Sequence, residues 1–413
     1  MHIQKVHLKN IRSFEDLEID FGNSGAGWHV ILGTNGTGKS TLIRSIALAL
    51  VGSPEAAVLG YKQSWKSWLR QGFDNGKIKL SLENKDLLSV SFDINNSPII
   101  KSTPHPLFFS AAYGSLRRLS GGNPDYKNIW ESNPILAAHL SVFGEDVALD
   151  QSLEWLFDLY MKGHFLRETL LDNPSQISSS STNHKNLLKY IKLFINTSSL
   201  LPNKILLSFI DYDEVRFKNQ KNLEVSITEL SDGYRSILSL VLELLRQVCR
   251  RYNDDITKIF SPDKTKIITK GVVLIDEIDA HLHPTWQAKI GEWFTEYFPN
   301  IQFIVTTHSP IICRSADTGT IWKLSTEGKS TQIEQIEGIE KKQLIYGNIL
   351  DAFETDLFGE DISRSEESKE ILKEMAVLNV KRQVGRISAT EETRLKELEQ
   401  IFPIDAQDNF LDD

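Results

Sequence analysis

The sequence predicts an α/β fold with an antiparallel N-terminal β subdomain, a mixed or parallel central sheet, a helical insertion and a helical C-terminal tail. Three observations predict this class. Residues 6–11 and 17–21 alternate apolar and polar side chains, as a pair of half-buried strands does. The apolar run at 28–32 leads through glycines into a helical spacing of apolar residues. A second apolar run, at 271–275, is as short as the buried strands of a parallel sheet.

Composition places the chain among ordinary globular proteins. It has 413 residues, of which 40% are hydrophobic and 24% charged, so we expect one large domain or two joined ones. No apolar stretch approaches the roughly 18 residues of a membrane helix, and the first residues form no apolar signal core. Two cysteines without metal-ligand neighbours favour the reducing cytoplasm. The net charge of −9 argues against a globally basic nucleic-acid binder, although a local basic strip stays compatible with it.

The order of patterns predicts four segments. We expect an N-lobe at 1–125, a helical insertion at 126–204, a C-lobe at 205–335 and a helical tail at 336–413. Further strands are predicted at 78–82, 88–94, 205–209, 224–227, 272–275 and 302–306. Helices are predicted within 129–171, at 233–252 and from Lys341 onward, and the serine-rich stretch 175–183 is predicted to be a surface loop.

The glycine-rich loop at 33–40, GTNGTGKS, matches the phosphate-binding pattern G-x-x-x-x-G-K-[ST] at every fixed position. Its glycines let backbone N–H groups turn toward phosphate oxygens, and the positive end of the following helix adds to the attraction. We expect Lys39 to reach the β- and γ-phosphates of ATP and the Ser40 hydroxyl to ligate Mg²⁺. The alternative is a glycine-rich turn without a ligand. The residues predicted to bind nucleotide here are Asn35, Gly36, Thr37, Gly38, Lys39, Ser40 and Thr41.

Two acids, Asp276 and Glu277, follow the apolar strand at 271–275. Downstream of a phosphate loop, this pattern predicts that Asp276 holds Mg²⁺ and that Glu277 orients or deprotonates the attacking water. Successive side chains of a strand point in opposite directions, so the two acids can take separate roles. An apolar strand that ends in Asp-Glu is a weak signal by itself, and the prediction therefore depends on the phosphate loop upstream.

Three further segments resemble the signature, D-loop and switch histidine of ABC-type P-loop ATPases. They are LSDGYRS at 230–236, DAHLHP at 279–284 and FIVTTHSP at 303–310. A serine and a glycine at a helix start offer a hydroxyl, N–H groups and the positive end of the helix dipole to a phosphate. Asp232 and Tyr234 replace a glycine and the glutamine of the common L-S-G-G-Q signature, which puts membership among the transporters in doubt.

The resemblance implies a composite site built by two copies of the chain. Ser231 and Gly233 would cap, in trans, the nucleotide held by the other copy. His308 would touch the γ-phosphate in cis and act with Lys39 and Glu277 as a catalytic group. Asp279 would contact nucleotide at the seam of the dimer.

Two arginine segments add to this resemblance. Arg12 resembles the early arginine of the RecF, SMC and OLD-like branch, where it approaches nucleotide phosphates. Its alternative is a solvent-exposed arginine in a turn. Residues 113–118 resemble a segment of small ATPases of that branch. Their Arg117 and Arg118 could serve nucleotide, a partner or DNA, or form a solvated face.

Three motifs are ambiguous. LSGGN at 119–123 is close in letters to the transporter signature, but a proline and an aspartate follow it, and we interpret it as a turn. The Q-loop glutamine has no clear place, although Gln63 and Gln71 are available. His281 and His283 are better explained by the D-loop than by a metal site.

The remaining chain narrows the function. About 190 residues separate the phosphate loop from the signature without sustained heptads, so no long coiled coil is expected. No nuclease motif follows His308. The tail, at 345–347, 356–359 and 363–369, resembles stand-alone bacterial ATPases encoded beside effectors, and most closely the ATPase subunit of Septu-type antiphage systems. Its apolar stripes would pack on the parent domain or dock an effector or another protomer; they comprise Ile371, Leu372, Met375, Leu378, Leu395, Leu398 and Ile401.

The resemblance therefore implies a cytoplasmic, Mg²⁺-dependent ATPase that hydrolyses ATP to ADP and phosphate. It would form a homodimer or a larger even-numbered oligomer and regulate a separate effector, such as a nuclease, in bacterial antiphage defence. The rival functions are a RecF-like DNA-repair clamp and a slow-turnover ATP sensor. Nucleic acid is a candidate partner, and no membrane contact is expected.

Overall fold

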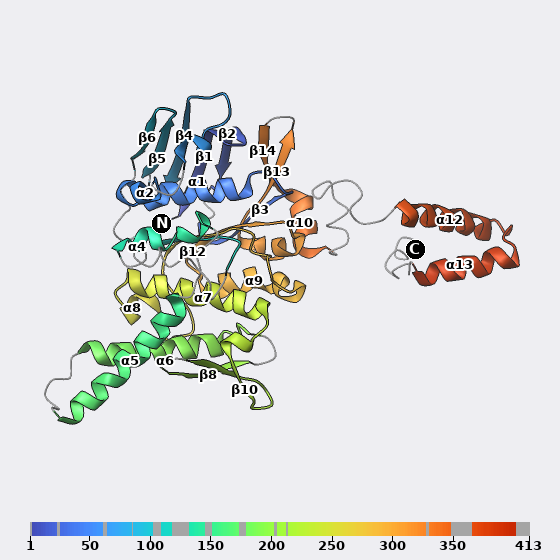
Figure 1. Ribbon diagram of the computed structural model, residues 1–413. Helices are drawn as coiled ribbons and strands as arrows, with labels where there is room; N and C mark the ends of the chain where they lie inside the picture. The colour runs from blue at the N-terminus through green and yellow to red at the C-terminus, as the bar shows by residue number, and fades with distance from the viewer. Residues whose placement is uncertain are drawn as a thin grey trace. The chain divides into compact units, whose positions relative to one another are not determined.

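The protein is described from a computed structural model. The residues described are 2–22, 25–60, 64–84, 86–101, 109–117, 132–144, 151–172, 179–201, 205–211, 214–327, 330–347 and 366–401. The chain forms two compact units, Met1–Ile349 and Leu350–Asp413. The first unit contains the β-sheets, and the second contains a helical hairpin (Figure 1).

The N-terminal sheet is antiparallel throughout, with the strand order β2-β1-β4-β5-β6. Its strands are β1 (Ile3–Ile11), β2 (Phe14–Asp20), β4 (Asn75–Leu82), β5 (Leu87–Asp93) and β6 (Asn96–Lys101). Alternation along β1 buries Val6 and Leu8 and leaves Lys5 and Lys9 exposed. The predicted antiparallel subdomain is confirmed.

The central sheet is mixed, with the strand order β14-β13-β3-β12-β11-β7. Its strands are β3 (Gly27–Gly33), β7 (Phe109–Tyr113), β11 (Gly271–Ile275), β12 (Ile301–Thr307), β13 (Ile321–Glu327) and β14 (Ser330–Ile336). The five strands from β13 to β7 are parallel, and β14 pairs with β13 in the antiparallel direction. The predicted fold class is confirmed. The carboxyl ends of β3, β12 and β11 consequently lie side by side at one edge of the sheet.

Helices cover both faces of the central sheet (Figure 1). Helix α1 (Lys39–Val51) lies between the N-terminal and central sheets, and its Leu42 and Ile46 share one core with Val6 and Leu274. Helices α7 (Asp232–Arg251) and α9 (Pro284–Tyr297) cover the other face. The described part of the unit also has shorter helices: α2 (Ser53–Gly60), η1 (Trp65–Trp68), α4 (Pro134–Ala137), η3 (Leu140–Val142), η6 (Ile227–Glu229), α8 (Ile256–Ile259), η7 (Pro310–Thr318) and α10 (Gly338–Tyr346).

Residues 151–226 contain two long helices, which lie within the predicted insertion, and a small sheet, which lies within the predicted C-lobe. Helix α5 (Gln151–Asp172) packs on α6 (Ser179–Thr197), and the sheet has the antiparallel order β10-β9-β8. Its strands are β8 (Leu206–Ile210), β9 (Val215–Lys218) and β10 (Glu224–Ser226). The prediction of a surface loop through 175–183 is wrong from Ser179 onward. The helix that buries Leu187, Ile191 and Phe194 extends back to Ser179, and residues 175–178 lie outside the described residues.

The second unit is an antiparallel pair of helices, α12 (Glu366–Gln383) and α13 (Ala389–Ile401). Met375 and Leu378 pack against Leu395 and Leu398. These tail stripes were predicted to cover the parent domain or a partner, but the four residues instead form the core of the hairpin itself. Helix α10 lies within residues 336–413, the segment predicted as the tail, yet it contacts η7 in the first unit.

Candidate functional site

The predicted site segments converge because β3, β12 and β11 are adjacent and parallel. The glycine-rich loop follows β3, the acid pair follows β11, and His308 follows β12. Segments more than 200 positions apart in the sequence are thus joined at one sheet edge, which is the usual ligand-binding position in open α/β sheets.

The glycine-rich loop has the tight backbone that its sequence predicts. Gly36 and Gly38 have φ values of 82° and 94°, which side-chain-bearing residues rarely adopt. A Cβ on Gly38 would lie 2.5 Å from the Ser13 hydroxyl oxygen. That hydroxyl is buried and has no hydrogen-bond partner among the described residues. The Thr37 hydroxyl donates to the Thr34 carbonyl, 2.9 Å away, and closes the loop.

Lys39 extends along this loop. Its ammonium donates to the carbonyls of Gly33 and Thr34, at 2.8 and 3.0 Å, and lies 3.5 Å from His308 Nδ1. Burial lowers the pKa of Lys39, against the opposing effect of Glu277 and the nearby aspartates. Burial and then the Lys39 charge also lower the pKa of His308, so its imidazole is neutral near pH 7.

Asp276 and Glu277 are held by Thr306 of the neighbouring strand β12. The Thr306 hydroxyl donates to Asp276 Oδ1 at 2.6 Å and accepts from the Glu277 amide at 2.8 Å. The Asp276 amide donates to the Tyr113 carbonyl of β7, 2.8 Å away. Glu277 has a φ of 48°, a strained value for a residue other than glycine. Asp276 is buried, whereas Glu277 is half-buried at the end of the strand.

Thr307 positions the D-loop in a similar way. Its hydroxyl donates to Asp279 Oδ1 at 2.6 Å and accepts from the Ser309 amide at 2.9 Å. Gln287 of α9 bonds to the Ser309 hydroxyl and, through its amide group, to the carbonyls of Asp279 and Leu282. Thr306, Thr307 and Gln287 had no predicted role. Two threonines directly before the histidine are the signal that would have indicated the first two.

Arg117 is another support without a predicted role, and its burial corrects both interpretations of its side chain, as a contact for nucleotide, a partner or DNA and as part of a solvated face. Only 5% of the residue is exposed. Its guanidinium donates to backbone carbonyls, those of Gly114 (3.1 Å), Asp276 (3.0 Å), Glu277 (3.0 Å), Ile278 (3.4 Å) and Ala280 (3.1 Å). Arg118 and residues 119–123 lie outside the described residues.

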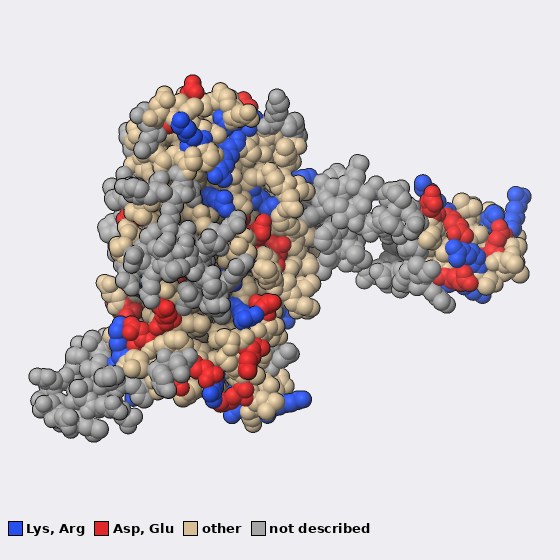
Figure 2. Space-filling model, viewed as in Figure 1, with Lys and Arg blue, Asp and Glu red and all other residues tan. Residues whose placement is uncertain are grey.

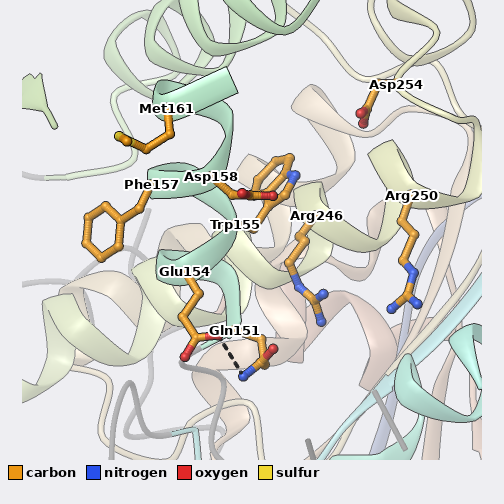
Figure 3. A pocket seen from close by; sticks show the side chains of 9 residues that line it. All are labelled: Gln151, Glu154, Trp155, Phe157, Asp158, Met161, Arg246, Arg250 and Asp254. Atoms are coloured by element: carbon orange, nitrogen blue, oxygen red, sulfur yellow. Dashed lines mark hydrogen bonds between the residues drawn. The ribbon is translucent and has the colours of Figure 1, made fainter. Parts of the chain in front are cut away.

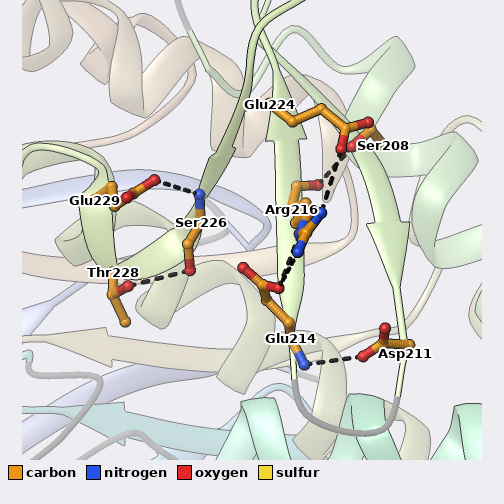
Figure 4. Close-up of polar contacts among 8 residues, drawn as sticks. All are labelled: Ser208, Asp211, Glu214, Arg216, Glu224, Ser226, Thr228 and Glu229. Atoms are coloured by element: carbon orange, nitrogen blue, oxygen red, sulfur yellow. Dashed lines mark hydrogen bonds and ion pairs between the residues drawn. The ribbon is translucent and has the colours of Figure 1, made fainter.

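The signature segment begins helix α7 as predicted. Ser231 occupies the N-cap position, is exposed, and makes no side-chain cap bond. Just before the signature segment, at the end of the small sheet, Ser226 and Glu229 form a capping box (Figure 4). A Cβ on Gly233 would lie 3.0 Å from the His281 carbonyl, so the signature contacts the D-loop of its own chain.

Arg12 lies in the turn between β1 and β2, with a φ of 46°. Its Nε donates to the Ser67 carbonyl at 3.2 Å, and its guanidinium lies over the Trp68 ring, 5.1 Å from the centroid. Burial lowers the pKa of Arg12, and the nearby Arg44 cation lowers it further. Arg12 is therefore a half-buried cation whose neighbour, Ser13, contacts the phosphate loop at Gly38.

The remaining predicted positions are plainly placed. Asn35 is exposed, and Ser40 and Thr41 are half-buried at the start of α1. Gln71 is exposed in the turn before β4, and Gln63 lies outside the described residues. His283 caps α9, because its Nδ1 accepts from the Thr285 amide.

A cavity of about 630 Å³ lies elsewhere, between α5 and the end of α7 (Figure 3). Its lining includes Trp155 and Arg250 but none of the predicted site residues. It is separate from the strand-end site.

A fall in stability is predicted for Thr306→Val, which keeps the shape of the side chain and removes the hydroxyl shared by Asp276 and the Glu277 amide. Leaving buried polar groups without a partner should lower the free energy of unfolding by about 1–3 kcal/mol. Urea unfolding beside Thr295→Val, which removes a hydroxyl bonded within α9, measures the effect. Equal stabilities of the two variants would contradict this role for Thr306.

Comparisons with known proteins agree with the motifs. Septu protein PtuA of Bacillus mycoides (strain KBAB4) is 29% identical over 327 residues, which cover 77% of this chain and 40% of that protein. The retron Ec83 probable ATPase of Escherichia coli is 24% identical over 418 residues, covering 82% of this chain and 74% of that protein. The chain thus spans well under two thirds of the Bacillus mycoides relative.

A solved SMC head bound to the C-winged helix domain of ScpA is 18% identical and covers 82% of this chain and 98% of that one, with a TM-score of 0.48.

Among the described residues, no helix is long and apolar enough to cross a membrane.

The family model described as "AAA domain, putative AbiEii toxin, Type IV TA system" matches residues 29–314. The resemblance to P-loop ATPases, and to the Septu ATPase in particular, is confirmed by this model and by the relatives above. Because the match covers more than half of the chain, the protein belongs to this family of AAA-domain P-loop ATPases.

Proposed function

We propose that this chain binds ATP with Mg²⁺ and hydrolyses it to ADP and phosphate, and that two copies close on each other around the nucleotide. The observation that carries the proposal is the convergence of Lys39, His308 and the acid pair at one sheet edge. A cation beside a glycine loop, together with carboxylates at the end of another parallel strand of the same sheet, is the arrangement that phosphoryl transfer requires.

The residues of the loop would bind the phosphates. Lys39 already donates to two carbonyls of the loop, so it can exchange these weak acceptors for anionic phosphate oxygens at little conformational cost. The positive-φ glycines and the start of α1 present backbone N–H groups. The Ser13 hydroxyl beside Gly38, which has no hydrogen-bond partner among the described residues, and the nearby Arg12 would supply further donors.

The donor chemistry also fits Mg²⁺. Ser40 and Asp276 offer a hydroxyl and a carboxylate, the hard oxygen donors that this cation prefers. Bound there, Mg²⁺ would neutralise phosphate charge. Thr306 holds the Asp276 carboxylate in place by its 2.6 Å hydrogen bond.

Glu277 would orient or deprotonate the attacking water, and His308 would contact the γ-phosphate. Glu277 is more exposed than Asp276, and its φ of 48° gives it a backbone conformation different from that of the strand before it. The lowered pKa of His308 keeps its imidazole neutral at pH 7, so a ring N–H can donate to phosphate while its second nitrogen stays near Lys39.

The second half of the site would come from another copy. Ser231 is exposed at the start of the 20-residue helix α7, and its hydroxyl makes no cap bond in its own chain. A helix start with an exposed hydroxyl suits an anionic phosphate. Asp279, held by Thr307 beside the signature, would contact nucleotide at the same seam.

The first test is steady-state phosphate release by the purified wild-type protein. We expect turnover with ATP and Mg²⁺ and loss of turnover when EDTA removes the metal. If the protein retained nucleotide but did not turn it over, the proposed function would change from an enzyme to a slow ATP sensor. If the protein showed neither ATP binding nor ATP turnover, the proposal would be overturned.

For the biological role, we propose that the ATPase regulates a separate effector, such as a nuclease, in antiphage defence. Support comes from the similarity to Septu protein PtuA and to the retron Ec83 probable ATPase. Co-purification with the product of an adjacent gene, with and without ATP, tests it. An adjacent effector that neither binds the chain nor changes activity with ATP would contradict the role.

The rival function, a DNA clamp, is tested by measuring DNA binding with the same purified protein. Figure 2 shows Lys and Arg side chains on the upper part of the first unit and more Asp and Glu side chains lower on this face. With Arg117 buried, the basic group predicted for DNA loses one member. Salt-dependent DNA binding at low ionic strength would nevertheless favour the clamp.

A further inference from the structure

We infer that Arg117 is a positioning residue for ATP hydrolysis: it fixes the backbone around Glu277 and thereby the direction of that carboxylate. The inference rests on the proposed ATPase function. Arg117 follows β7, more than 150 positions before Glu277 in the sequence, and reaches it because β7 pairs with β11.

The two terminal nitrogens of the guanidinium act together as a backbone clamp. Nη1 donates to two carbonyls and Nη2 to three. The two nitrogens carry four hydrogens, so at least one hydrogen is shared between two acceptors. Four of the acceptors belong to residues 276–280, which run from the acid pair into the D-loop.

The clamp determines the conformation of Glu277 in particular. The Asp276 carbonyl and the Glu277 amide belong to one peptide plane; Arg117 holds the carbonyl and Thr306 holds the amide. Arg117 also holds the Glu277 carbonyl, which belongs to the next plane. With both flanking planes fixed, the φ and ψ of Glu277 are fixed, and so is the direction of its Cα–Cβ bond.

The clamp also opposes strain. Glu277 and His281 have φ values of 48° and 65°, and such conformations persist only where surrounding contacts impose them. Arg117 spans the carbonyls between these two residues. Removing it should let the turn relax toward ordinary φ values and move the Glu277 carboxylate away from its position.

The charge of Arg117 has a second effect. Burial lowers its pKa to about 10, against the opposing effect of Asp279, Asp276 and Glu277, so it stays charged at pH 7. Among the described residues, Arg117 donates its hydrogen bonds to backbone carbonyl oxygens and not to these carboxylates. Arg117 therefore balances three neighbouring acids without occupying the oxygens that the site needs.

Arg117→Met and Arg117→Lys separate the parts of this role. Methionine removes charge and donors, whereas lysine keeps the charge but loses the planar fork that serves several carbonyls. Arg314→Met is the matched control, because Arg314 donates to the Gly347 carbonyl at 3.3 Å, outside the acid pair and the D-loop.

We expect kcat to fall about 100-fold or more in both Arg117 variants, while ATP affinity stays within about threefold, since a displacement near 1 Å is enough for such a loss. Thermal unfolding curves, measured beside kcat and ATP affinity, give the folded fraction of each variant at the assay temperature. Guanidinium ion at low millimolar concentration should partly restore Arg117→Met, and it should not change Arg314→Met. Arg117→Lys decides the matter if Arg117→Met does not fold.

The outcomes distinguish the two proposals. Absence of turnover in wild type would overturn the proposed hydrolysis, and this inference with it. Turnover in wild type with unchanged kcat in folded Arg117→Lys would overturn the inference alone. Equal losses of kcat, ATP affinity and folded fraction would reduce Arg117 to a structural residue, which also overturns it.

Discussion

Glu277→Gln is expected to lower ATP turnover by about 100-fold or more while ATP binding stays within about threefold of wild type. The substitution keeps the size and the backbone contacts of residue 277, including the Thr306 bond to its amide and the Arg117 bond to its carbonyl. It removes the negative oxygen that would orient or deprotonate the attacking water. Phosphate release and equilibrium binding of a fluorescent ATP analogue measure the two effects separately.

Glu292→Gln in α9 is the matched control, because Glu292 is exposed outside the site. It should turn over ATP at the wild-type rate. Turnover by Glu277→Gln at the same rate would show that another group activates the water and would remove Glu277 from the site.

Lys39→Met should weaken ATP binding about 10- to 100-fold and abolish turnover, because a hydrogen bond to a charged group contributes about 1.5–3 kcal/mol. Methionine has nearly the length of lysine but cannot donate to the phosphates. The variant should also lose the contacts with the Gly33 and Thr34 carbonyls. Binding of the same analogue, titrated with and without Mg²⁺, measures the loss.

Lys341→Met is the matched control. Lys341 in α10 also donates to a backbone carbonyl, that of Gly319, at 2.8 Å. That variant should bind ATP normally. Unaltered ATP affinity in Lys39→Met would mean that the loop at 33–40 is a turn without a phosphate ligand.

The strands that the sequence predicts well are those with a local signal. Residues 6–9 alternate apolar and polar side chains, and the runs at 28–32 and 271–275 are apolar and bounded by glycine or acids. Strand β14 alternates less clearly and depends on its pairing with β13, and β7 owes its place to parallel pairing with β11. Such partners are remote in sequence, so a window of neighbouring residues does not reveal them.

The site divides in the same way. Lys39, Asp276 and Glu277 lie in contiguous motifs whose chemistry is legible from spacing. Thr306 and Arg117 act on backbone atoms about 30 and 160 positions away, and a backbone carbonyl leaves no letter in the sequence. Support of a catalytic side chain through its own backbone was therefore found only in the three-dimensional arrangement.

The central claim, that each ATP site is completed by a second copy, is tested most directly by mixing two inactive variants, Lys39→Met and Ser231→Arg. A mixed dimer would contain one site with both defects and one site with neither. After denaturation and refolding together, or co-expression, an equal mixture should regain about a quarter of wild-type turnover, because half of the dimers are mixed and one of their two sites is intact. No activity above the separate variants, with mixed dimers demonstrated by differential tags, would contradict the composite site.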